Sequence, residues 1–343
     1  MSELTRVQLR PPYLILIGEL TDATYAKTGQ GIVQWRPDLV IGQLRLPGCT
    51  IDLGVPDLTV AEARKAGVGS LIIGVAPIGG RVPDSWWAVI EEAAASGLDV
   101  VNGLHIRLGD HARVAAAARA SGARLIDVRV PPPDLPVGTG IRRSGRRILT
   151  VAGDCAIGKK FTALELDRSM REAGMNSTYR ATGQTGIMIA GEGIPIDAVV
   201  ADFISGAAEM LSPSNDPDHW DVIEGQGSIF HPGYSAVSLG LLHGSQPDGI
   251  VVCHDPARSN VVGWEHYKVP ALRECIETHL SLGRRINPDI RCVGISVNTS
   301  SLMKLRREEY LAELSAQTGL PCVDPLIDGC HAITQHIRNT TER

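Results

Sequence analysis

The sequence lacks the features that mark a membrane, secreted or zinc-binding protein. Its 343 residues contain no apolar run of about 18 residues, which a transmembrane helix needs. The amino terminus has no signal-peptide layout. The seven cysteines include no Cys-x-x-Cys pair, which argues against a disulfide framework and against a zinc site. We therefore expect a cytoplasmic protein with reduced thiols and no metal.

An excess of charge of either sign is also missing. The formal net charge is −5 and the isoelectric point is about 6.1, so we predict no basic surface for nucleic acid. The simplest interpretation of the one local basic cluster is a solvated linker. The cluster consists of Arg142, Arg143, Arg146 and Arg147. With 43% hydrophobic and 21% charged residues the composition is typical of a globular protein, and the length allows two domains.

The strongest motif lies at Arg147–Leu166, RILTVAGDCAIGKKFTALEL. A short β-branched and apolar run, Ile148–Ala152, is followed by Gly-x-x-x-x-Gly-Lys and then by a helix-forming run, Phe161–Arg171. This order of strand, glycine loop and helix is the context that a phosphate-binding P-loop requires. The backbone N–H groups of such a loop and the positive end of the helix dipole attract an anion. The alternative is a glycine turn that only joins a strand to a helix.

The P-loop pattern departs from the usual one at a single position. Lys160 occupies the place where Ser or Thr would hold Mg²⁺, and the nearest hydroxyl, on Thr162, lies two residues further along. We therefore interpret the loop as an anion cradle and regard ATP as the less favoured ligand. The candidate cofactor-binding residues are those of the loop: Gly153, Asp154, Cys155, Ala156, Ile157, Gly158, Lys159 and Lys160.

Short apolar runs alternate with helix-forming segments throughout the chain, which predicts an α/β fold with mainly parallel sheets. Residues 131–145 are rich in proline and glycine, so they cannot continue a helix or fill a central strand. We predict a Rossmann-like N-terminal domain at residues 1–135, a linker at 136–146, and a P-loop NTPase-like domain at 147–343.

In the N-terminal domain, the connections after strands are expected to lie at one edge of the sheet, where open α/β sheets bind ligands. These connections are Lys27–Gly31, Gly79–Arg81 and Gly103–His105, and Lys27 and His105 are candidates for a site role, with solvated or structural residues as the alternative. The predicted strands are Tyr13–Gly18, Asp38–Ile41, Ser70–Val75, Leu98–Val101 and Arg124–Val128, and the predicted helices are Trp86–Ala95 and His111–Ser121.

The second domain repeats the alternation, with glycine-rich connections at Thr182–Gly186 and Gly225–Gly227. After the P-loop helix, the predicted strands are Ser177–Ala181, Asp197–Asp202, Asp221–Glu224, Gly249–Cys253, Arg291–Val297 and Cys322–Val323. The predicted helices are Phe203–Leu211, Ser235–Leu242, Ala271–Leu282, Leu302–Ala316 and Leu326–Ile337.

Acidic residues near the ends of strands are the candidates for proton transfer. Glu224 ends the run DVIE directly before Gly-Gln-Gly, and Asp154 lies within the P-loop. A carboxylate beside bound phosphates is unfavourable unless it pairs with a cation or takes up a proton, and the candidate cations are Lys159, Lys160 and a substrate ammonium group. Asp202 is a weaker candidate, because capping of the helix that follows would explain it equally well. For Glu224 the alternative is an exposed turn residue.

Other polar residues are candidates for holding a substrate. Arg180 precedes a glycine-rich loop and suits bidentate binding of a carboxylate or phosphate, with an ordinary ion pair as the alternative. His231 and His254 titrate near neutrality when unperturbed and are further candidate bases, with a hydrogen-bonded structural histidine as the alternative. Cys155 stands at a helix N-terminus, where a thiolate is favoured, but we prefer a packing role. The candidate substrate-binding residues are Arg180, Gln184, Thr185, Gln226 and His231.

Long blocks of the sequence resemble one family, the D-glutamate N-acetyltransferases (DgcN), long catalogued as a domain of unknown function. Together the blocks cover nearly the whole chain. Family members commonly have Gly-Thr where this chain has Ala152-Gly153, and we expect no change of function from that departure. The blocks are IGVAPIGGRVPDSWW, GLDVVNGLH, GDCAIGKKFTALEL, RATGQTGIMIAGEGIPIDAVVADFISGAAE, DHWDVIEGQGSIFHPGYSAVSLGLLHGSQPD and VVCHDP.

The resemblance implies a Rossmann-like domain followed by a P-loop domain, and transfer of an acetyl group from acetyl-CoA to the amino group of D-glutamate. The product, N-acetyl-D-glutamate, would pass to a partner dehydrogenase in D-glutamate catabolism, and a homo-oligomer is implied at the level of the family. On this interpretation Gly153–Lys160 holds the phosphates of coenzyme A and Arg180 holds a substrate carboxylate. Glu224 first, or Asp154 second, takes the proton of the amine. No metal, nucleic acid or membrane is expected to take part.

Two other functions stay open. The turn at Glu224–Gly227 also resembles the Glu-Gly-x-Gly turn of dethiobiotin synthetase, which implies an ATP- and Mg²⁺-dependent kinase or ligase acting on a small carboxylate. Glu224 and Asp202 would then bind Mg²⁺, with Thr162 in place of the absent hydroxyl. The third function is a nucleotide-sensing module without catalysis, because a P-loop by itself fits all three.

Overall fold

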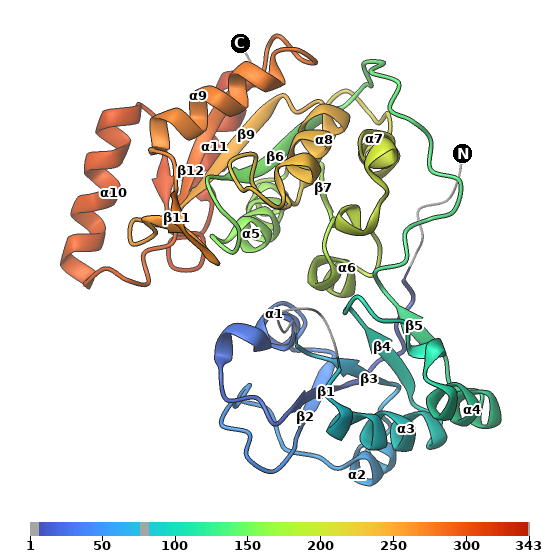
Figure 1. The fold of residues 1–343 in the computed structure, drawn as a ribbon. Coiled ribbons are helices and arrows are strands. Elements are labelled where there is room, and N and C mark those ends of the chain that lie inside the picture. The colour runs from blue at the N-terminus through green and yellow to red at the C-terminus, as the bar shows by residue number, and fades with distance from the viewer. Residues whose placement is uncertain (1–6, 76–81, 342–343) are drawn as a thin grey trace. The chain divides into compact units, whose positions relative to one another are not determined.

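A computed structural model describes residues 7–75 and 82–341, and its contacts divide the chain into two compact units (Figure 1). The N-terminal unit comprises Thr5–Pro131 and Gly183–Ala198, and the P-loop unit comprises Pro132–Thr182 and Val199–Arg343. The sequence analysis assigned Gly183–Ala198 to the P-loop domain, whereas the structure places this segment in the N-terminal unit.

A five-stranded parallel sheet forms the centre of the N-terminal unit, in the order β2-β1-β3-β4-β5. All six residues of β1 are buried, as expected for an unbroken apolar run in the middle of a parallel sheet. Every strand predicted for this unit is present, β1 with the predicted bounds and the others with shifted ends. The strands are β1 (Tyr13–Gly18), β2 (Val40–Arg45), β3 (Ser70–Ile73), β4 (Asp99–Asn102) and β5 (Leu125–Asp127).

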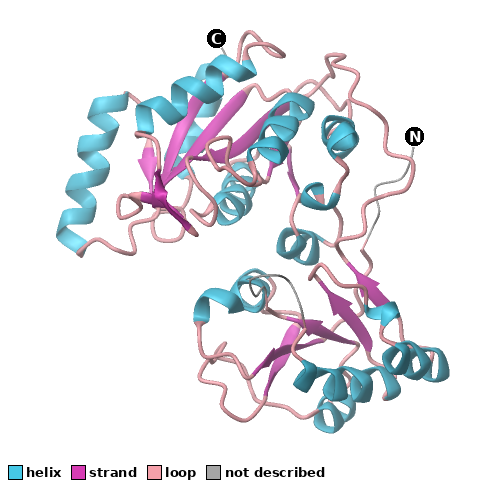
Figure 2. Ribbon diagram, viewed as in Figure 1, coloured by secondary structure: helices cyan, strands magenta, loops and turns pink. Residues whose placement is uncertain are grey.

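Helices cover both faces of this sheet (Figure 2). Apolar side chains of the central strands pack in one core with α2, α3 and α4. The two predicted helices correspond to α3 and α4. The α-helices are α1 (Lys27–Trp35), α2 (Val60–Lys65), α3 (Trp87–Ala95), α4 (Ala112–Ser121) and α6 (Gln184–Ala190), and the 3-10 helices are Ala23–Ala26, Asp84–Trp86, Leu108–Asp110 and Ile196–Ala198.

The prediction of a loop at Lys27–Gly31 is wrong, because α1 begins at Lys27. The glycines of this stretch allow close packing rather than a turn. Gly29 donates its backbone N–H to the Gly74 carbonyl oxygen at 2.8 Å, and a Cβ on Gly29 would lie 3.0 Å from the side chain of Ile15. The helix is therefore fitted against the carboxyl ends of β1 and β3.

The glycine-rich stretch at 182–186 is also not a loop throughout, because α6 begins at Gln184. Its Thr185 hydroxyl lies 3.0 Å from the Thr28 hydroxyl of α1, and both groups are buried. At the far end of the segment, Asp197 forms an ion pair with Arg129. These two contacts explain why Gly183–Ala198 folds with the N-terminal unit.

A six-stranded parallel sheet forms the centre of the P-loop unit, in the order β13-β12-β9-β6-β8-β7. The strands are β6 (Arg146–Ala152), β7 (Ser177–Arg180), β8 (Trp220–Ile223), β9 (Gly249–His254), β12 (Arg291–Val297) and β13 (Cys322–Val323). A separate antiparallel hairpin, not predicted from the sequence, is formed by β10 (Asn260–Val261) and β11 (Trp264–Lys268). The predicted mainly parallel sheets are thus confirmed in both units.

The helices of the P-loop unit also lie on both faces of the sheet (Figures 1 and 2). α5 and α11 contact each other on one face, and α7, α8 and α9 lie on the other. No helix in the described part of the chain is long and apolar enough to span a membrane. The helices are α5 (Lys159–Glu172), α7 (Ile204–Leu211), α8 (Ser235–Ser245), α9 (Leu272–Gly283), α10 (Lys304–Thr318) and α11 (His331–Thr341).

The predicted strand at Asp197–Asp202 is wrong. The structure has two 3-10 helices here, Ile196–Ala198 and Ala201–Phe203. Val199 is buried, but Val200 is 67% exposed and Asp202 is exposed, so the run is not buried on both faces as an inner strand of a parallel sheet would be. The β-propensity of the two valines is overridden because no strand lies beside them.

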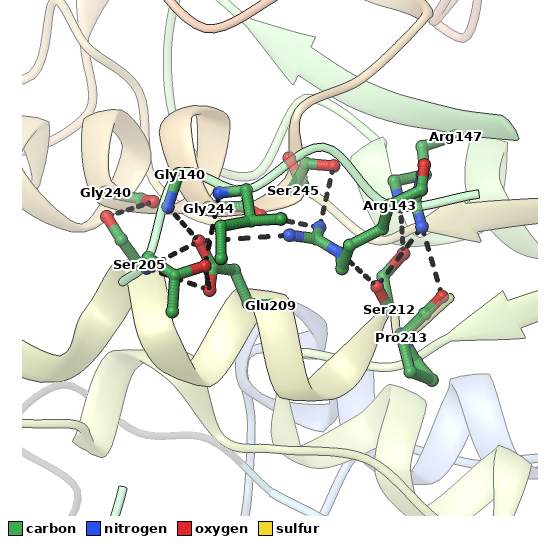
Figure 3. A network of polar contacts seen from close by, with 12 residues as sticks. Gly140, Arg143, Arg147, Ser205, Glu209, Ser212, Pro213, Gly240, Gly244 and Ser245 are labelled. Atoms are coloured by element: carbon green, nitrogen blue, oxygen red, sulfur yellow. Dashed lines mark hydrogen bonds and ion pairs between the residues drawn. The ribbon is translucent and has the colours of Figure 1, made fainter. Parts of the chain in front are cut away.

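The basic cluster runs into the start of β6, and its interpretation as a solvated linker is wrong for Arg143 and Arg147, whereas Arg142 is exposed and pairs with Asp248 at 2.7 Å. Arg147 is 2% exposed, and its guanidinium donates to the Ser212 hydroxyl at 2.7 Å and to the Pro213 carbonyl oxygen at 3.1 Å (Figure 3). Arg143 donates to the Ser212 and Gly244 carbonyl oxygens, each at 2.8 Å, and burial lowers the pKa of Arg143 to about 10.

The chain before this cluster is held on α7 in the same way. The Glu209 carboxylate accepts hydrogen bonds from the backbone N–H groups of Thr139 and Gly140, at 2.8–3.0 Å (Figure 3). This part of the proline- and glycine-rich stretch therefore packs against α7, which satisfies its Thr139 and Gly140 N–H groups.

Candidate functional site

The P-loop lies where the strand order of its unit reverses. β6 has β9 on one side and β8 on the other, so the loop after β6 occupies the switch point at which open α/β sheets bind ligands. The loop ends at Gly158, whose φ is +121°, and α5 begins at Lys159. Ala156 has a φ of +55°, a conformation that residues with a Cβ rarely adopt and that is frequent at functional sites.

The beginning of α5 gathers positive charge. No side chain caps this helix, so the loop or a ligand must satisfy its first backbone N–H groups. The Lys159 ammonium group is nearly buried and donates to the Asp154 carbonyl oxygen at 2.9 Å. Lys160 lies with Nζ 4.3 Å from the centre of the Phe161 ring. Two ammonium groups and a helix N-terminus together suit a phosphate group.

Asp154 is the most enclosed charged group of the loop, with no exposed surface. Its Oδ1 accepts the Cys155 backbone N–H at 2.6 Å. Its Oδ2 accepts Arg258 Nη1 and the Val262 backbone N–H, both at 3.0 Å. Arg258 and Val262 come from the segment that contains the β10–β11 hairpin, so one carboxylate joins that segment to the P-loop.

His231 lies beside this carboxylate. The side-chain ligand atoms of Asp154, Cys155 and His231 are all within 4.8 Å of one another, which makes them the one candidate metal-binding group among the described residues. The His231 ring stacks on Tyr234, with centroids 4.4 Å apart, and meets the edge of Trp264 at 4.6 Å. The Gly233 backbone N–H donates to His231 Nδ1 at 3.0 Å, so that ring nitrogen already has a partner.

The pKa values of Cys155 and His231 are both shifted by burial, and the shift at Cys155 is opposite to the one that its position before a helix predicts. Burial raises the pKa of the Cys155 thiol, although the thiol stands at a helix N-terminus. The thiolate expected from that position alone is therefore not favoured, and the preferred packing role is consistent with the structure. Burial lowers the pKa of His231, so its imidazole is neutral at pH 7.

Glu224 follows β8, directly beside the P-loop strand. The next residue, Gly225, donates its backbone N–H to the Thr150 hydroxyl at 2.9 Å. A Cβ on Gly225 would lie 1.7 Å from the Thr150 carbonyl oxygen and 3.0 Å from Lys159 Cδ, so only glycine fits. The turn after Glu224 is thereby held against both the P-loop strand and the P-loop lysine.

The Glu224 carboxylate itself is 4% exposed and faces the end of β7. Its Oε2 accepts the Tyr179 hydroxyl at 2.9 Å and the Thr182 backbone N–H at 3.0 Å. Burial and the neighbouring carboxylate raise the pKa of Tyr179 well above its usual value, so the phenol stays a donor. Gln226 Nε2 donates to the Thr182 hydroxyl at 3.0 Å, which adds a second predicted site residue to this group.

Arg180 does not extend toward the P-loop. Its Nε donates to the Asp221 carboxylate at 2.7 Å. In β8 the residue opposite Arg180 is Ile223, and Asp221 lies two positions before Ile223. The guanidinium therefore runs back along the sheet, away from its carboxyl edge. Ser212 and His219 also contact Asp221, at 2.6 and 3.3 Å. The pairing matches the ion-pair alternative, although the pair is buried rather than exposed.

The remaining predicted residues belong to other parts of the structure. Gln184 and Thr185 are in the first turn of α6, in the N-terminal unit, and both are buried. In the same unit Lys27 is the first residue of α1 and His105 is exposed. The predicted connection Gly79–Arg81 lies outside the described residues.

The hydroxyl expected to replace the missing Mg²⁺ ligand is not accessible. Thr162 has no exposed surface, and its Oγ1 lies 2.7 Å from the Ser296 hydroxyl and 3.1 Å from the Gly158 carbonyl oxygen. Asp202, the second acid of that alternative, follows no strand, because it lies in a 3-10 helix. His254 ends β9 and shares a hydrogen bond of 2.8 Å with the Tyr310 hydroxyl.

Sequence reasoning missed three groups of the site: Tyr179, which contacts Glu224; Arg258, which contacts Asp154; and Trp264, which contacts His231. Tyr179 carries no signal beyond its place in a strand. Arg258 and Trp264 lie on either side of a hairpin turn whose signal, Val262-Gly263 between two short extended runs, is present in the sequence. Gly263 has a φ of +80°, as such a two-residue turn requires.

Known proteins share both units. Residues 136–334 match the family model described as the DUF1611_C P-loop domain, and residues 44–131 match the DUF1611_N Rossmann-like domain. A crystal structure of a DUF1611 family protein from Anabaena variabilis ATCC 29413 is similar to this chain with a TM-score of 0.88 at 33% identity, over 96% of this chain and 100% of that one.

Two curated relatives carry the name D-glutamate N-acetyltransferase. A protein of Tritonibacter scottomollicae is 47% identical over 321 residues, 94% of this chain and 96% of the relative. A protein of a Pseudoalteromonas species is 43% identical over 331 residues, 96% of this chain and 100% of the relative. The resemblance noted from the sequence is confirmed: this chain belongs to the DUF1611 family, together with these two D-glutamate N-acetyltransferases.

Proposed function

We propose that this protein transfers the acetyl group of acetyl-CoA to the amino group of D-glutamate, giving N-acetyl-D-glutamate and free coenzyme A. The name of the two relatives, which match over nearly the whole chain, supports this function. The observation within the molecule that supports this function best is the P-loop. The loop has the lysines and the uncapped helix start of an anion site, but it has Lys160 where Mg²⁺-dependent hydrolysis needs a hydroxyl.

The P-loop would hold the phosphate groups of coenzyme A. The uncapped start of α5, Lys159 and Lys160 supply backbone donors and two positive charges for these groups. Because a lysine stands where a Mg²⁺-binding hydroxyl is usual, and Thr162 is buried against Ser296, we expect binding without a metal. For the same reason we do not favour the kinase or ligase alternative.

The reaction requires a neutral amine. A base removes one proton from the D-glutamate ammonium group, and the amine nitrogen then attacks the thioester carbonyl carbon. The C–N bond forms, the C–S bond breaks, and the nitrogen gives up its second proton, which the released thiolate takes up. Glu224 is our first candidate for the base, because its carboxylate adjoins a turn packed on Lys159. Asp154, the second candidate, is fully buried among three N–H donors.

Other parts of the proposal follow from the family resemblance. Gln226 and His231, which lie near the two acids, are retained as candidate substrate-binding residues. Arg180, Gln184 and Thr185 stay in the proposal with less support, since each is committed to another contact or lies buried in α6. We also propose a homo-oligomer, a cytoplasmic location where acetyl-CoA is available, and a dehydrogenase that consumes N-acetyl-D-glutamate.

The first experiment is acetyl-CoA-dependent thiol release with D-glutamate, L-glutamate or no amine, with EDTA present. Thiol release with D-glutamate alone would support the transferase and a P-loop that works without metal. No release, followed by ADP formation with ATP, Mg²⁺ and an acidic substrate, would favour the kinase or ligase instead.

The base is tested by Glu224→Gln. Loss of a general base lowers kcat by about 10²- to 10⁴-fold, and removes the acid limb that the base contributes to the pH–rate profile. Glu274→Gln, an exposed residue of α9, is the matched control and should have wild-type kinetics. Near-normal turnover of Glu224→Gln with an unchanged pH profile would exclude this residue as the base.

A further inference from the structure

The P-loop contains a negative charge that opposes its proposed ligand. Asp154 is the second residue of the loop, and its carboxylate is completely buried. A carboxylate beside bound phosphates costs free energy unless a cation compensates it. Lys159 does not do so directly, because its ammonium group donates to the backbone carbonyl oxygen of Asp154 and not to the carboxylate.

The compensating cation comes from the segment around the hairpin, residues 256–270. Arg258 Nη1 lies 3.0 Å from Asp154 Oδ2, and the Val262 backbone N–H holds the same oxygen. The segment also covers the start of the loop, since a Cβ on Gly153 would lie 3.0 Å from Val269 Cγ1 and 3.1 Å from Pro270. Asp154 therefore fixes the position of Arg258 against the loop.

Arg258 has further binding capacity. Its side chain is 23% exposed, and it has no other hydrogen-bond partner in the part of the chain that the structure describes. A guanidinium group offers five N–H donors in a rigid fork that matches phosphate oxygens. One donor holds Asp154 here, and the others are available to a ligand at the loop.

We propose that Arg258 is a phosphate-binding residue of the P-loop, and that Asp154 is the positioning residue that orients it and whose charge it neutralises. The ligand that Arg258 would bind carries a pyrophosphate or a phosphomonoester. That this ligand is acetyl-CoA rests on the proposed function. Asp154 then has no role as a base, because both its oxygens already accept N–H donors and its side chain has no exposed surface from which to reach the substrate amine.

A metal site formed by Asp154, Cys155 and His231 is a less favourable explanation of the same cluster. Both Asp154 oxygens and His231 Nδ1 already accept hydrogen bonds, and a guanidinium occupies the side from which a cation would approach the carboxylate. A cation there would have to displace Arg258. The cluster is better explained as a compensated charge that prepares the loop for an anion.

The test compares acetyl donors with and without nucleotide phosphates. For Arg258→Gln, we expect coenzyme A binding by titration calorimetry to weaken about 10- to 100-fold, with KM for acetyl-CoA rising in parallel. Turnover of S-acetyl-pantetheine, which lacks the pyrophosphate, should stay within about twofold of wild type. Arg284→Gln, an exposed arginine after α9, removes the same charge elsewhere and should leave both donors unaffected.

The role of Asp154 is tested by a double-mutant cycle. Arg258→Gln leaves a buried carboxylate uncompensated, whereas Arg258→Gln combined with Asp154→Asn does not. The double variant should therefore bind coenzyme A about tenfold more tightly than Arg258→Gln alone. A merely structural arginine would give no such recovery.

Three outcomes overturn the inference. These are normal coenzyme A binding by Arg258→Gln, equal losses with both acetyl donors, or no recovery in the double variant. Arg258→Lys, which keeps the charge, covers the case in which Arg258→Gln fails to fold, and it should bind coenzyme A more tightly than any neutral variant that folds. If the wild type neither binds coenzyme A nor releases its thiol, the proposed function falls as well; if it does both, only the role of Arg258 is in question.

Discussion

His279 should make the P-loop unit sensitive to acid. It lies on α9, is 2% exposed, and donates from Nδ1 to the Cys275 carbonyl oxygen at 2.7 Å. Together with Lys159 and the turn at Gly225–Ser228 it lines a small cavity. Burial, and to a lesser extent the Lys159 ammonium, lower the pKa of His279 from 6.5 to about 4, against the opposing effect of the Cys275 carbonyl.

The direction of the effect follows from proton linkage. Between pH 6.5 and about 4 the unfolded chain binds a proton at this residue and the folded chain does not, so the free energy of unfolding falls as the pH falls. A shift of about 2.5 pKa units corresponds to about 3 kcal/mol once the pH is below the folded pKa. Between pH 7 and pH 4.5, roughly 2 kcal/mol of that is lost.

The measurement is urea unfolding of wild type and His279→Gln at pH 7 and at pH 4.5. Loss of the buried ring lowers the stability of the variant at pH 7, but its further loss on acidification should be smaller than that of wild type by about 2 kcal/mol. His331→Gln on α11, an exposed histidine of the same unit, is the control and should follow wild type. Equal acid losses in wild type and His279→Gln would refute the reasoning.

Two further substitutions test the P-loop and the turn beside it. Gly225→Ala places a Cβ 1.7 Å from the Thr150 carbonyl oxygen, so we expect the free energy of unfolding, measured in urea, to fall by about 3 kcal/mol or more. The control is Gly109→Ala, whose Cβ would meet nothing within 4 Å and whose stability should be close to that of wild type. Equal stabilities of the two variants would contradict the packing argument. Cys155→Ser should retain acetyl transfer within about threefold, because burial keeps this residue a thiol, and a loss of about 100-fold in the same assay would instead indicate a nucleophile.

Local patterns in the sequence predicted most of the sheet and the position of the P-loop. The runs at β1 and β9 are apolar between their ends, and β6 is apolar after its two arginines except for Thr150, which is the pattern of strands buried on both faces. The P-loop has the further advantage that its glycines, lysine and helix are contiguous. Features that depend on neighbours in sequence were therefore predictable.

The parts that failed depend on contacts between distant residues. Gly183–Ala198 follows a strand of the P-loop unit but folds with the N-terminal unit, because Thr185 meets Thr28 and Asp197 meets Arg129. Val199-Val200 has the composition of a strand, yet no partner strand lies beside it. Neither fact is encoded within a window of a few residues.

The candidate site shows the same division. The sequence placed Asp154 and Glu224 correctly at the edge of the sheet, but it could not identify their partners. Asp154 is paired with a residue 104 positions away, and Glu224 accepts a hydrogen bond from a residue 45 positions away. The partners determine whether a carboxylate is a base or a counter-ion, so the assignment of roles needed the fold.

The loss of the usual P-loop hydroxyl has a geometric consequence that helps to distinguish binding from hydrolysis. Successive residues of an α-helix are about 100° apart around its axis, so moving a hydroxyl from position 160 to Thr162 rotates it by about 200°. The hydroxyl then faces Ser296 of β12, inside the unit. A lysine at 160 instead adds a positive charge to the first turn of α5, with its Nζ 4.3 Å from the centre of the Phe161 ring. On the proposed function this loop binds phosphates without a metal, and we therefore expect coenzyme A to bind equally well with EDTA and with added Mg²⁺.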